Sequence, residues 1–276
     1  MAANGYLGKQ QSLKETLSTL IMNPPQKIEI IPVPGIPLIK EGDDIGLILI
    51  ECLETHGISL QDSDVIVIAE TIISKAEGNI VDLRDIMPSS QAMELSEKTG
   101  KDPRLCELIL REAVEIVRVG NGPIIAETKH GNVCASCGID HSNVSGDKDH
   151  VVLLPEDPDR SAADIRGKIL KATGKDVPVI INDTQGRPLR AGAVGTAIGL
   201  SGLVPIWVRA GESDLYGYIL EASPIAIADE LASAASILHG QSDEGIPIVI
   251  IRGARYLRGE GSAADLLRDR QKDLFR

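Results

Sequence analysis

Short apolar runs and longer stretches with helical spacing alternate along the chain. An alternating run predicts a strand at residues 27–33, and runs rich in β-branched residues predict buried strands at 64–68, 123–126, 151–154, 177–181 and 246–251. Apolar residues spaced by three and four predict helices that start near Asp44, Pro88, Asp102, Asp157 and Pro224. The pattern therefore predicts a mixed α/β chain.

Two of these predictions also fix how elements would connect. The helix after Asp102 is expected to pack against the helix at 88–99 as an antiparallel hairpin, with a buried face made of Leu105, Leu108, Ile109, Ala113, Ile116 and Val117. The strand at 151–154, the helix after Asp157 and the strand at 177–181 predict a β-α-β unit. Ligands bind at the carboxyl ends of the strands in such units.

The two ends of the chain show weaker patterns. Leu13, Leu17 and Leu20 recur at helical spacing, so residues 12–22 of an extension at 1–26 are expected to form a short amphipathic helix. This helix would dock on the body of the protein, at 27–276, or on a partner. Ser262 is expected to cap a charged amphipathic tail that runs through Leu274.

Two aspartates stand where buried strands are expected to end. Asp140 lies in a loop of small and amide-bearing residues, 131–144, that follows the strand at 123–126. Asp183 follows the strand at 177–181, and Arg187 and Arg190 come soon after it. Carboxylates suit Mg²⁺ or Mn²⁺, and cations suit phosphates. The two segments therefore predict a metal-assisted phosphoryl-transfer site.

Other features near these acids admit two interpretations. Lys75 follows the strand at 64–68 by a few residues and would reach phosphate as a point charge or remain an ordinary solvated lysine. Glycines recur through residues 186–203, where they would allow close approach to phosphate or to a neighbouring element.

Composition narrows the function classes. The chain has 276 residues and a formal net charge of −12, which argues against sequence-independent binding to nucleic acid, so local cations must hold any anionic ligand. No window is apolar enough to span a bilayer. Four cysteines without a signal-peptide pattern favour the cytoplasm. Cys134 and Cys137 form a CxxC pair that could be redox-active or half of a zinc site, but the chain has no second pair, which favours a structural role.

Several short blocks in a fixed order resemble the coenzyme F-420 γ-glutamyl ligase family. The blocks are GIPLIKEGDD at 35–44, ISKAEG at 73–78, GNVC at 131–134, GID-x-SNV at 138–144, DT-x-GR-x-x-R at 183–190, AIG at 197–199, VIIRG at 249–253 and GEGS at 259–262. The resemblance covers residues 27–276. It implies an α+β fold with two subdomains in an intertwined homodimer.

The resemblance also implies roles for individual residues. Metal ligands would be Asp140, Asp183 and Thr184. Residues bordering the nucleotide would be Ile36, Pro37, Leu38, Ile39, Thr71, Lys75, Asn143, Thr184, Gly240 and Gln241. Residues that neutralise charge during catalysis would be Asp140, Asp183, Lys75, Arg187 and Arg190. One or two Mg²⁺ or Mn²⁺ ions are the implied cofactors, with K⁺ as a further candidate.

The implied reaction is a GTP-dependent, GDP-forming ligation of L-glutamate to the carboxylate of a deazaflavin coenzyme precursor. A carboxylate is a poor electrophile, so it would first become an acyl phosphate, which the glutamate amine displaces. His141 is a candidate base only because it adjoins Asp140. Tyr218 stands where the family pattern has an arginine. That departure leaves open a ligase for another acidic acceptor, and a non-catalytic binding homologue is the remaining alternative.

Overall fold

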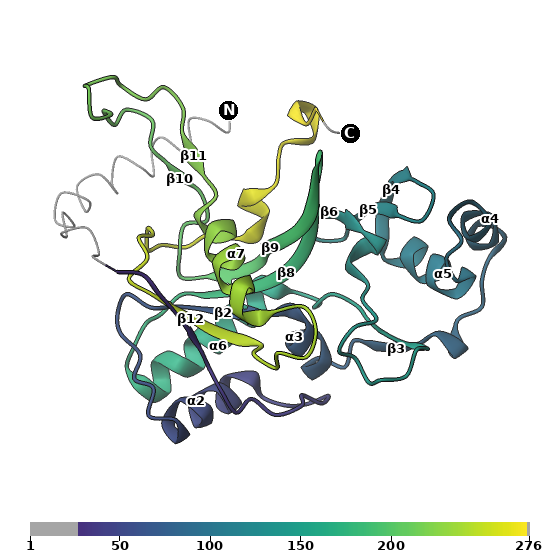
Figure 1. Ribbon diagram of the computed structural model, residues 1–276, viewed down its shortest axis with the longest axis horizontal. Helices are drawn as coiled ribbons and strands as arrows, with labels where there is room; N and C mark the ends of the chain where they lie inside the picture. The colour runs from purple at the N-terminus through teal and green to yellow at the C-terminus, as the bar shows by residue number, and fades with distance from the viewer. Residues whose placement is uncertain (1–26, 275–276) are drawn as a thin grey trace.

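A five-stranded sheet forms the centre of the computed structural model, which describes residues 27–274 (Figure 1). Its strand order is β1-β12-β2-β8-β9, with bounds Glu29–Pro32, Ile248–Arg252, Val65–Ala69, Val179–Arg187 and Arg190–Ser201. Strands β2 and β8 are parallel, and all other neighbours are antiparallel. The strands predicted at 27–33, 64–68, 177–181 and 246–251 are confirmed. The helix predicted at 12–22 lies outside the described residues.

The sheet is buried on both faces because its side chains alternate between two helical layers. Ile66 and Ile68 of β2 pack against α2 (Ile45–Thr55) and α6 (Pro158–Thr173), whereas Val65 and Val67 pack against α7 (Ile227–His239). A strand buried on both faces requires a continuous apolar run. The runs rich in valine and isoleucine meet this requirement, which explains why they form the buried strands of the central sheet.

A third cluster of buried residues lies beside the central sheet, in the blue-to-teal part of Figure 1. It includes α4 (Ser90–Thr99), α5 (Pro103–Glu112) and an antiparallel sheet of β4 (Ala113–Val119), β5 (Ile124–Thr128) and β6 (Val133–Ala135). The helix predicted to continue to Val117 was wrong in its second half. The helix ends at Glu112, and Ala113, Ile116 and Val117 belong to β4, which pairs with β5. The α4–α5 contact is confirmed.

The predicted β-α-β unit at 151–181 was also wrong. Strand β7 (His150–Val152) pairs antiparallel with β3 (Ile80–Asp82) in a separate ribbon, and the parallel partner of β8 is β2. The helix between them, α6, forms as predicted between Asp157 and Gly174. Apolar runs predict strands but do not specify which strands pair.

Strand β9 passes unusually close to two helices, and glycine makes this possible. A Cβ on Gly195 would lie 2.5 Å from the carbonyl oxygen of Ala232 in α7, and one on Gly199 would lie 2.6 Å from that of Pro158 in α6. Gly186 and Gly192, farther along the β8–β9 hairpin, face open space. The inner glycines of 186–203 are thus required for packing.

After the central sheet is complete, the last part of the described chain, up to Leu274, contains short 3₁₀ turns. Ser262 caps Ala263–Leu266 with a capping box, and a second turn follows at Arg270–Lys272. The predicted cap is confirmed, but the tail is not one amphipathic helix. The Arg270 guanidinium forms an ion pair with Glu115 of β4 and lies 3.5 Å from the carboxylate of Glu127 of β5. The segment around Arg270 therefore contacts the β4–β5–β6 sheet.

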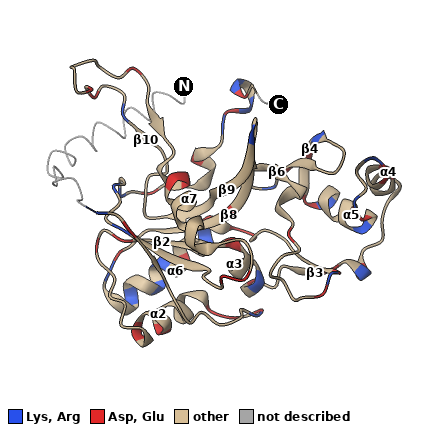
Figure 2. Ribbon diagram, in the orientation of Figure 1, with Lys and Arg blue, Asp and Glu red and all other residues tan. Residues whose placement is uncertain are grey.

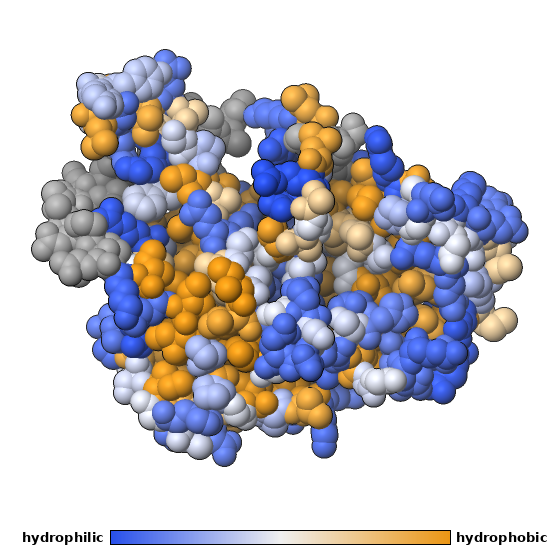
Figure 3. Space-filling view, in the orientation of Figure 1, coloured by the Kyte–Doolittle hydropathy of each residue, from blue (hydrophilic) through white to orange (hydrophobic). Residues whose placement is uncertain are grey.

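The face of the molecule seen in Figures 2 and 3 carries mixed charge and an apolar region. Figure 2 shows acidic and basic residues interspersed over most elements, with basic residues at the tip of the β8–β9 hairpin. Apolar side chains gather where β1, β12 and α7 lie (Figure 3), and Ile28 and Ile237 are among the exposed apolar residues. Between residues 27 and 274, no helix has both the length and the apolar character needed to span a membrane.

Candidate functional site

A cavity of about 640 Å³ opens where five parts of the chain converge. Its wall includes the loop at 36–39, the start of α3 (Glu70–Ala76), the segment from β6 to Asn143, the β8–β9 hairpin, and the loop between α7 and β12. This volume is in the range of pockets that hold a small molecule or cofactor. Both aspartates singled out in the sequence line it.

Asp140 is held rigidly by its own loop. Its Oδ1 accepts hydrogen bonds from the backbone amides of His141 (2.7 Å) and Ser142 (3.0 Å), and its Oδ2 accepts one from the Ser142 hydroxyl (2.6 Å). Its own backbone pairs with Val152. The sequence pattern predicted that the loop with Asp140 directly follows the strand at 123–126. In the structure, β6 and a 3₁₀ turn at Ser136–Gly138 lie between that strand and Asp140.

Asp183 lies inside strand β8 rather than at its end. Its Oδ1 accepts a hydrogen bond from the backbone amide of Thr184 (2.6 Å), and its Oδ2 accepts one from the side-chain amide of Gln185 (2.9 Å). Burial raises the pKa of Asp183, and the negative charge of Asp140 acts in the same direction. The carboxylates of Asp140 and Asp183 are therefore close enough to repel each other electrostatically.

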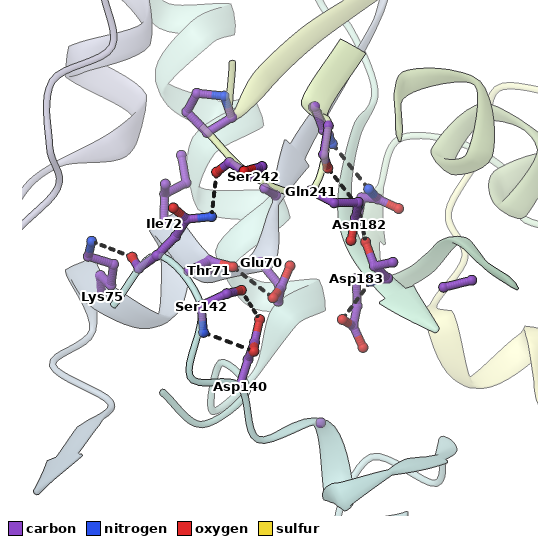
Figure 4. A pocket seen from close by; sticks show the side chains of 18 of the residues that line it. Glu70, Thr71, Ile72, Lys75, Asp140, Ser142, Asn182, Asp183, Gln241 and Ser242 are labelled. Carbon is purple, nitrogen blue, oxygen red and sulfur yellow. Dashed lines mark hydrogen bonds between the residues drawn. The ribbon is translucent and has the colours of Figure 1, made fainter. Parts of the chain in front are cut away.

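Glu70 is a third acid in the cavity, and our sequence reasoning missed it. It is the first residue of α3, directly after buried strand β2, and its Oε1 accepts a hydrogen bond of 2.8 Å from the Thr71 hydroxyl. Burial and the charge of Asp183 raise the pKa of Glu70 to about 8. An acid after an apolar run was the same signal that identified Asp183. Figure 4 shows Glu70, Asp140 and Asp183 around one space.

The acids fit a hard divalent cation. None of the three is paired with a cation in the described chain, so their mutual repulsion is uncompensated there. Between residues 27 and 274, no three His, Cys, Asp or Glu side chains are grouped tightly enough to hold a metal by themselves. Mg²⁺ needs no such cage, because it commonly takes one or two carboxylates and completes its shell with water and phosphate oxygens. Asp140, Asp183 and the hydroxyl of Thr184 would be the protein ligands.

The residues predicted to border a nucleotide lie together. The Lys75 ammonium, whose pKa burial lowers, donates to the carbonyl of Asn143 (3.1 Å), and the Asn143 amide donates to the carbonyl of Ser242 (3.0 Å). Gln241 donates from its side-chain amide to the hydroxyl of Thr184 (3.1 Å). All ten predicted residues line the cavity: Ile36, Pro37, Leu38, Ile39, Thr71, Lys75, Asn143, Thr184, Gly240 and Gln241.

A buried polar contact behind Asp183 supports this arrangement. The Asn182 amide donates to Ser236 and to Nδ1 of His239, each at 3.1 Å. Burial lowers the pKa of His239 to about 4, so the ring is neutral near pH 7 and accepts through Nδ1. The contact ties β8 to the end of α7, where the loop with Gln241 begins. Nothing in the sequence pattern indicated this pair.

Most of the other candidates lie outside the cavity wall. Arg187 and Arg190 face each other at the exposed tip of the β8–β9 hairpin. His141 is exposed and does not line the cavity. Tyr218 is 60% exposed in the loop between β10 (Trp207–Val208) and β11 (Pro224–Ile225). Cys134 lines the cavity, but burial raises the pKa of its thiol to about 12 and that of Cys137 to about 11.

Comparison with known proteins gives one consistent family. The model of the family described as F420-0:Gamma-glutamyl ligase matches residues 35–253. The chain is 55% identical over 251 residues to the coenzyme F420:L-glutamate ligase of Methanothermobacter thermautotrophicus, covering 90% of this chain and 99% of that protein. Proteins of the same name from Methanocaldococcus jannaschii (51% identical; 91% and 98% covered) and Methanosarcina mazei (41% identical; 91% and 96% covered) are also similar.

Proposed function

Because the chain belongs to the F420-0:gamma-glutamyl ligase family, we propose that it joins L-glutamate to the carboxylate of coenzyme F420-0 at the expense of GTP. The observation that carries the proposal is the convergence of Asp140 and Asp183 in a single cavity with all ten residues expected at the nucleotide. The relatives named for this ligation match nine-tenths of the chain.

The proposed chemistry has two steps. A carboxylate oxygen of the acceptor attacks the γ-phosphorus of GTP, the bond to the β–γ bridging oxygen breaks, and GDP leaves. The amine nitrogen of glutamate then attacks the acyl carbon of the acyl phosphate, inorganic phosphate leaves, and the amine loses a proton as the amide forms. Neither step needs a nucleophile from the protein.

The chain's own residues position the reactants and offset charge. The Lys75 ammonium, held by the Asn143 carbonyl, faces the cavity and would bind phosphate. Asp140 and Asp183 are fixed by hydrogen bonds to their neighbours, so each presents its carboxylate in one orientation. Asp140, Asp183 and the Thr184 hydroxyl would hold a Mg²⁺ or Mn²⁺ ion, which would supply positive charge against the phosphates. The loops at 36–39 and 240–242 would enclose the nucleotide.

A ligase acting on another acidic acceptor remains the second candidate, because Tyr218 replaces the arginine of the family pattern. Tyr218 does not line the cavity of its own chain, so this replacement leaves the nucleotide and metal residues unchanged. A non-catalytic homologue is disfavoured because Asp140, Asn143, Asp183 and Thr184 are all present and close to one another. We further infer a cytoplasmic homodimer from the family resemblance.

An endpoint assay by mass spectrometry tests the proposal. Purified protein, Mg²⁺ or Mn²⁺, GTP, L-glutamate and coenzyme F420-0 should give a product heavier by one or more glutamyl residues, together with GDP. Asp140→Asn and Asp183→Asn should each abolish product while keeping the wild-type circular dichroism spectrum. Absence of product from the wild type, with either GTP or ATP, would refute the proposed function.

A further inference from the structure

The side of the central sheet that carries α7 keeps an apolar surface exposed. Ile30 of β1 packs against the buried cluster that α7 shares with the sheet. Ile28 precedes it by two residues, so in an extended chain its side chain lies on the same side, and it is 59% exposed. Ile237 of α7 is 74% exposed. We call this surface the α7 face (Figure 3); it comprises Ile28, Ile30, Ala234, Ile237 and Leu238.

The outward side of α7 lacks the charged residues that a surface helix normally carries. After Glu230 the helix reads LASAASIL at 231–238, without one charged side chain. Ala234, Ile237 and Leu238 are spaced by three and four, so they share one side of the helix, and none of them is fully buried. An apolar outward side is typical of a helix that another element covers.

The strand beside the α7 face is at the edge of the sheet. Within residues 27–274 the one partner of β1 is β12, and native proteins commonly cover such an edge with a helix or a loop. The carbonyl oxygen of Lys27 lies so close to Gly253 that a Cβ on this glycine would be 2.5 Å from it. The extension at 1–26 therefore joins the body beside the end of β12, next to Ile28 and the α7 face.

The extension has the length and the pattern to cover this face. A helix at 12–22 would be about 16 Å long, and the residues between it and Ile28 would span up to about 20 Å when extended. The extension also carries two lysines and one glutamate in a chain with a net charge of −12, so its charge is opposite to that of the body. The apolar residues of this helix would fall on one side: Leu13, Leu17, Leu20 and Ile21.

We propose that residues 12–22 dock as an amphipathic helix on the α7 face of their own chain, with their leucines against Ile28 and Ile237. The docked helix is an addition to the family fold. The family model begins at residue 35, and a relative matched over 99% of its own length leaves a tenth of this chain unmatched. The inference does not depend on the proposed function, because the surfaces that carry it lie outside the catalytic cavity.

Hydrogen exchange measured by mass spectrometry on the full chain tests the docking. The amides of residues 13–22 should exchange at least about ten times more slowly than in a synthetic peptide of residues 1–26. Ile237→Glu, and separately Ile28→Glu, should return them to the rate of the peptide. Leu47→Glu is the matched control, because Leu47 is an equally exposed apolar residue on α2, on the other side of the sheet, and it should leave the slow exchange unchanged.

Disulfide trapping shows which chain the segment covers. All four native cysteines are buried, so Leu17→Cys/Ile237→Cys should form a bond between the two new thiols under mild oxidation and still migrate as a single chain without reductant. Thr19→Cys/Ile237→Cys places the first thiol on the polar side of the helix and should stay mostly reduced.

The remaining outcomes contradict the inference. Exchange at the peptide rate in the wild type would show that the segment does not dock. Slow exchange that persists in Ile237→Glu and Ile28→Glu would place the segment on another surface. A disulfide between two chains would make a second copy the occupant of the α7 face, and equal trapping through Leu17→Cys and Thr19→Cys would rule out a fixed helix.

Discussion

The ammonium of Lys75 lies 3.1 Å from the backbone carbonyl of Asn143, to which it donates a hydrogen bond. This contact joins the last turn of α3 to the loop that carries Asp140. Removing the ammonium takes away a phosphate-binding charge and also releases that loop. Lys75→Ala is therefore expected to weaken GTP binding by roughly 10- to 100-fold, as for other hydrogen bonds to charged groups. Titration with a fluorescent GTP analogue measures this, and Lys171→Ala, on the exposed face of α6, should match the wild type.

The uncompensated acids should make stability depend on divalent cations. Mg²⁺ or Mn²⁺ at about 100 times its Kd is expected to raise the melting temperature by about 5–10 °C, because only the folded chain brings Asp140 and Asp183 together. Asp183→Asn should lose most of this shift, whereas Asp164→Asn, on an exposed position of α6, should keep it. Differential scanning calorimetry with and without the ion gives the answer. An equal shift in all three proteins would contradict the metal assignment.

The buried cysteines should be unreactive in the folded protein. All four are free and buried, and the pKa values of Cys134 and Cys137 are raised to about 12 and 11. At pH 8 the thiolate that reacts with a disulfide reagent is therefore almost absent. We expect little labelling of the native chain and complete labelling after unfolding. Cys137→Ser should keep the turnover rate within about twofold of the wild type, whereas a redox role would require thiol titration coupled to activity.

Two glycines should respond to alanine in opposite directions. In Gly199→Ala the new methyl group would meet Pro158 of α6, which should destabilise the fold by about 1–3 kcal/mol. Gly167 lies within α6 with nothing near its Cβ position, so Gly167→Ala should stabilise the fold by about 0.5–1 kcal/mol through helix propensity. Urea unfolding of both variants measures the two changes. Equal effects would show that β9 does not need its close approach to α6.

The helix cap at Asp102 should give a pH-dependent contribution to stability. Asp102 accepts from the backbone amide of Arg104, and the Arg104 side chain holds the pKa of Asp102 below its usual value. A lowered pKa in the folded state means that the stabilisation is present above the unfolded pKa, near 3.8, and is lost as the pH falls through the folded value. Asp102→Ala is expected to cost about 1 kcal/mol at pH 7. The difference from wild type should shrink below pH 3.8 in urea unfolding, and a constant difference would argue against the charged cap.

The sequence predicted those elements whose pattern allows one interpretation only. The β-branched runs of β2, β8 and β12 have no competing helical period, and the helices at Pro103 and Pro158 each begin with an aspartate cap followed by proline. The segment after Glu112 is different. Ala113, Ile116 and Val117 fit helical spacing as well as a strand, and only pairing with β5 decides between them. Strand partners were equally undetermined, which is why β7 was joined to the wrong sheet.

Some residues of the candidate site could likewise be predicted from the sequence, and others could not. Acids next to apolar runs could be found from sequence, although Glu70 was overlooked, because strands deliver their terminal residues to a common region. The Asn182–His239 contact joins residues 57 positions apart and leaves no local pattern. Arg187 and Arg190 were grouped with Asp183 because they are close in sequence. The structure places them at the hairpin tip, outside the cavity wall, and their predicted role in catalysis stays a prediction.

The hydrogen bonds that join the walls of the cavity connect residues far apart in the sequence. They link Lys75 with Asn143 (68 positions apart), Asn143 with Ser242 (99 positions) and Thr184 with Gln241 (57 positions). Contacts of this kind form late, because distant segments must meet before any of them contributes. Strand β12 follows the loop at 240–242 in the chain and must insert between β1 and β2. Nascent fragments that stop before β12 therefore lack both this strand and the contacts that close the cavity, and they will not compete with the folded protein for nucleotide.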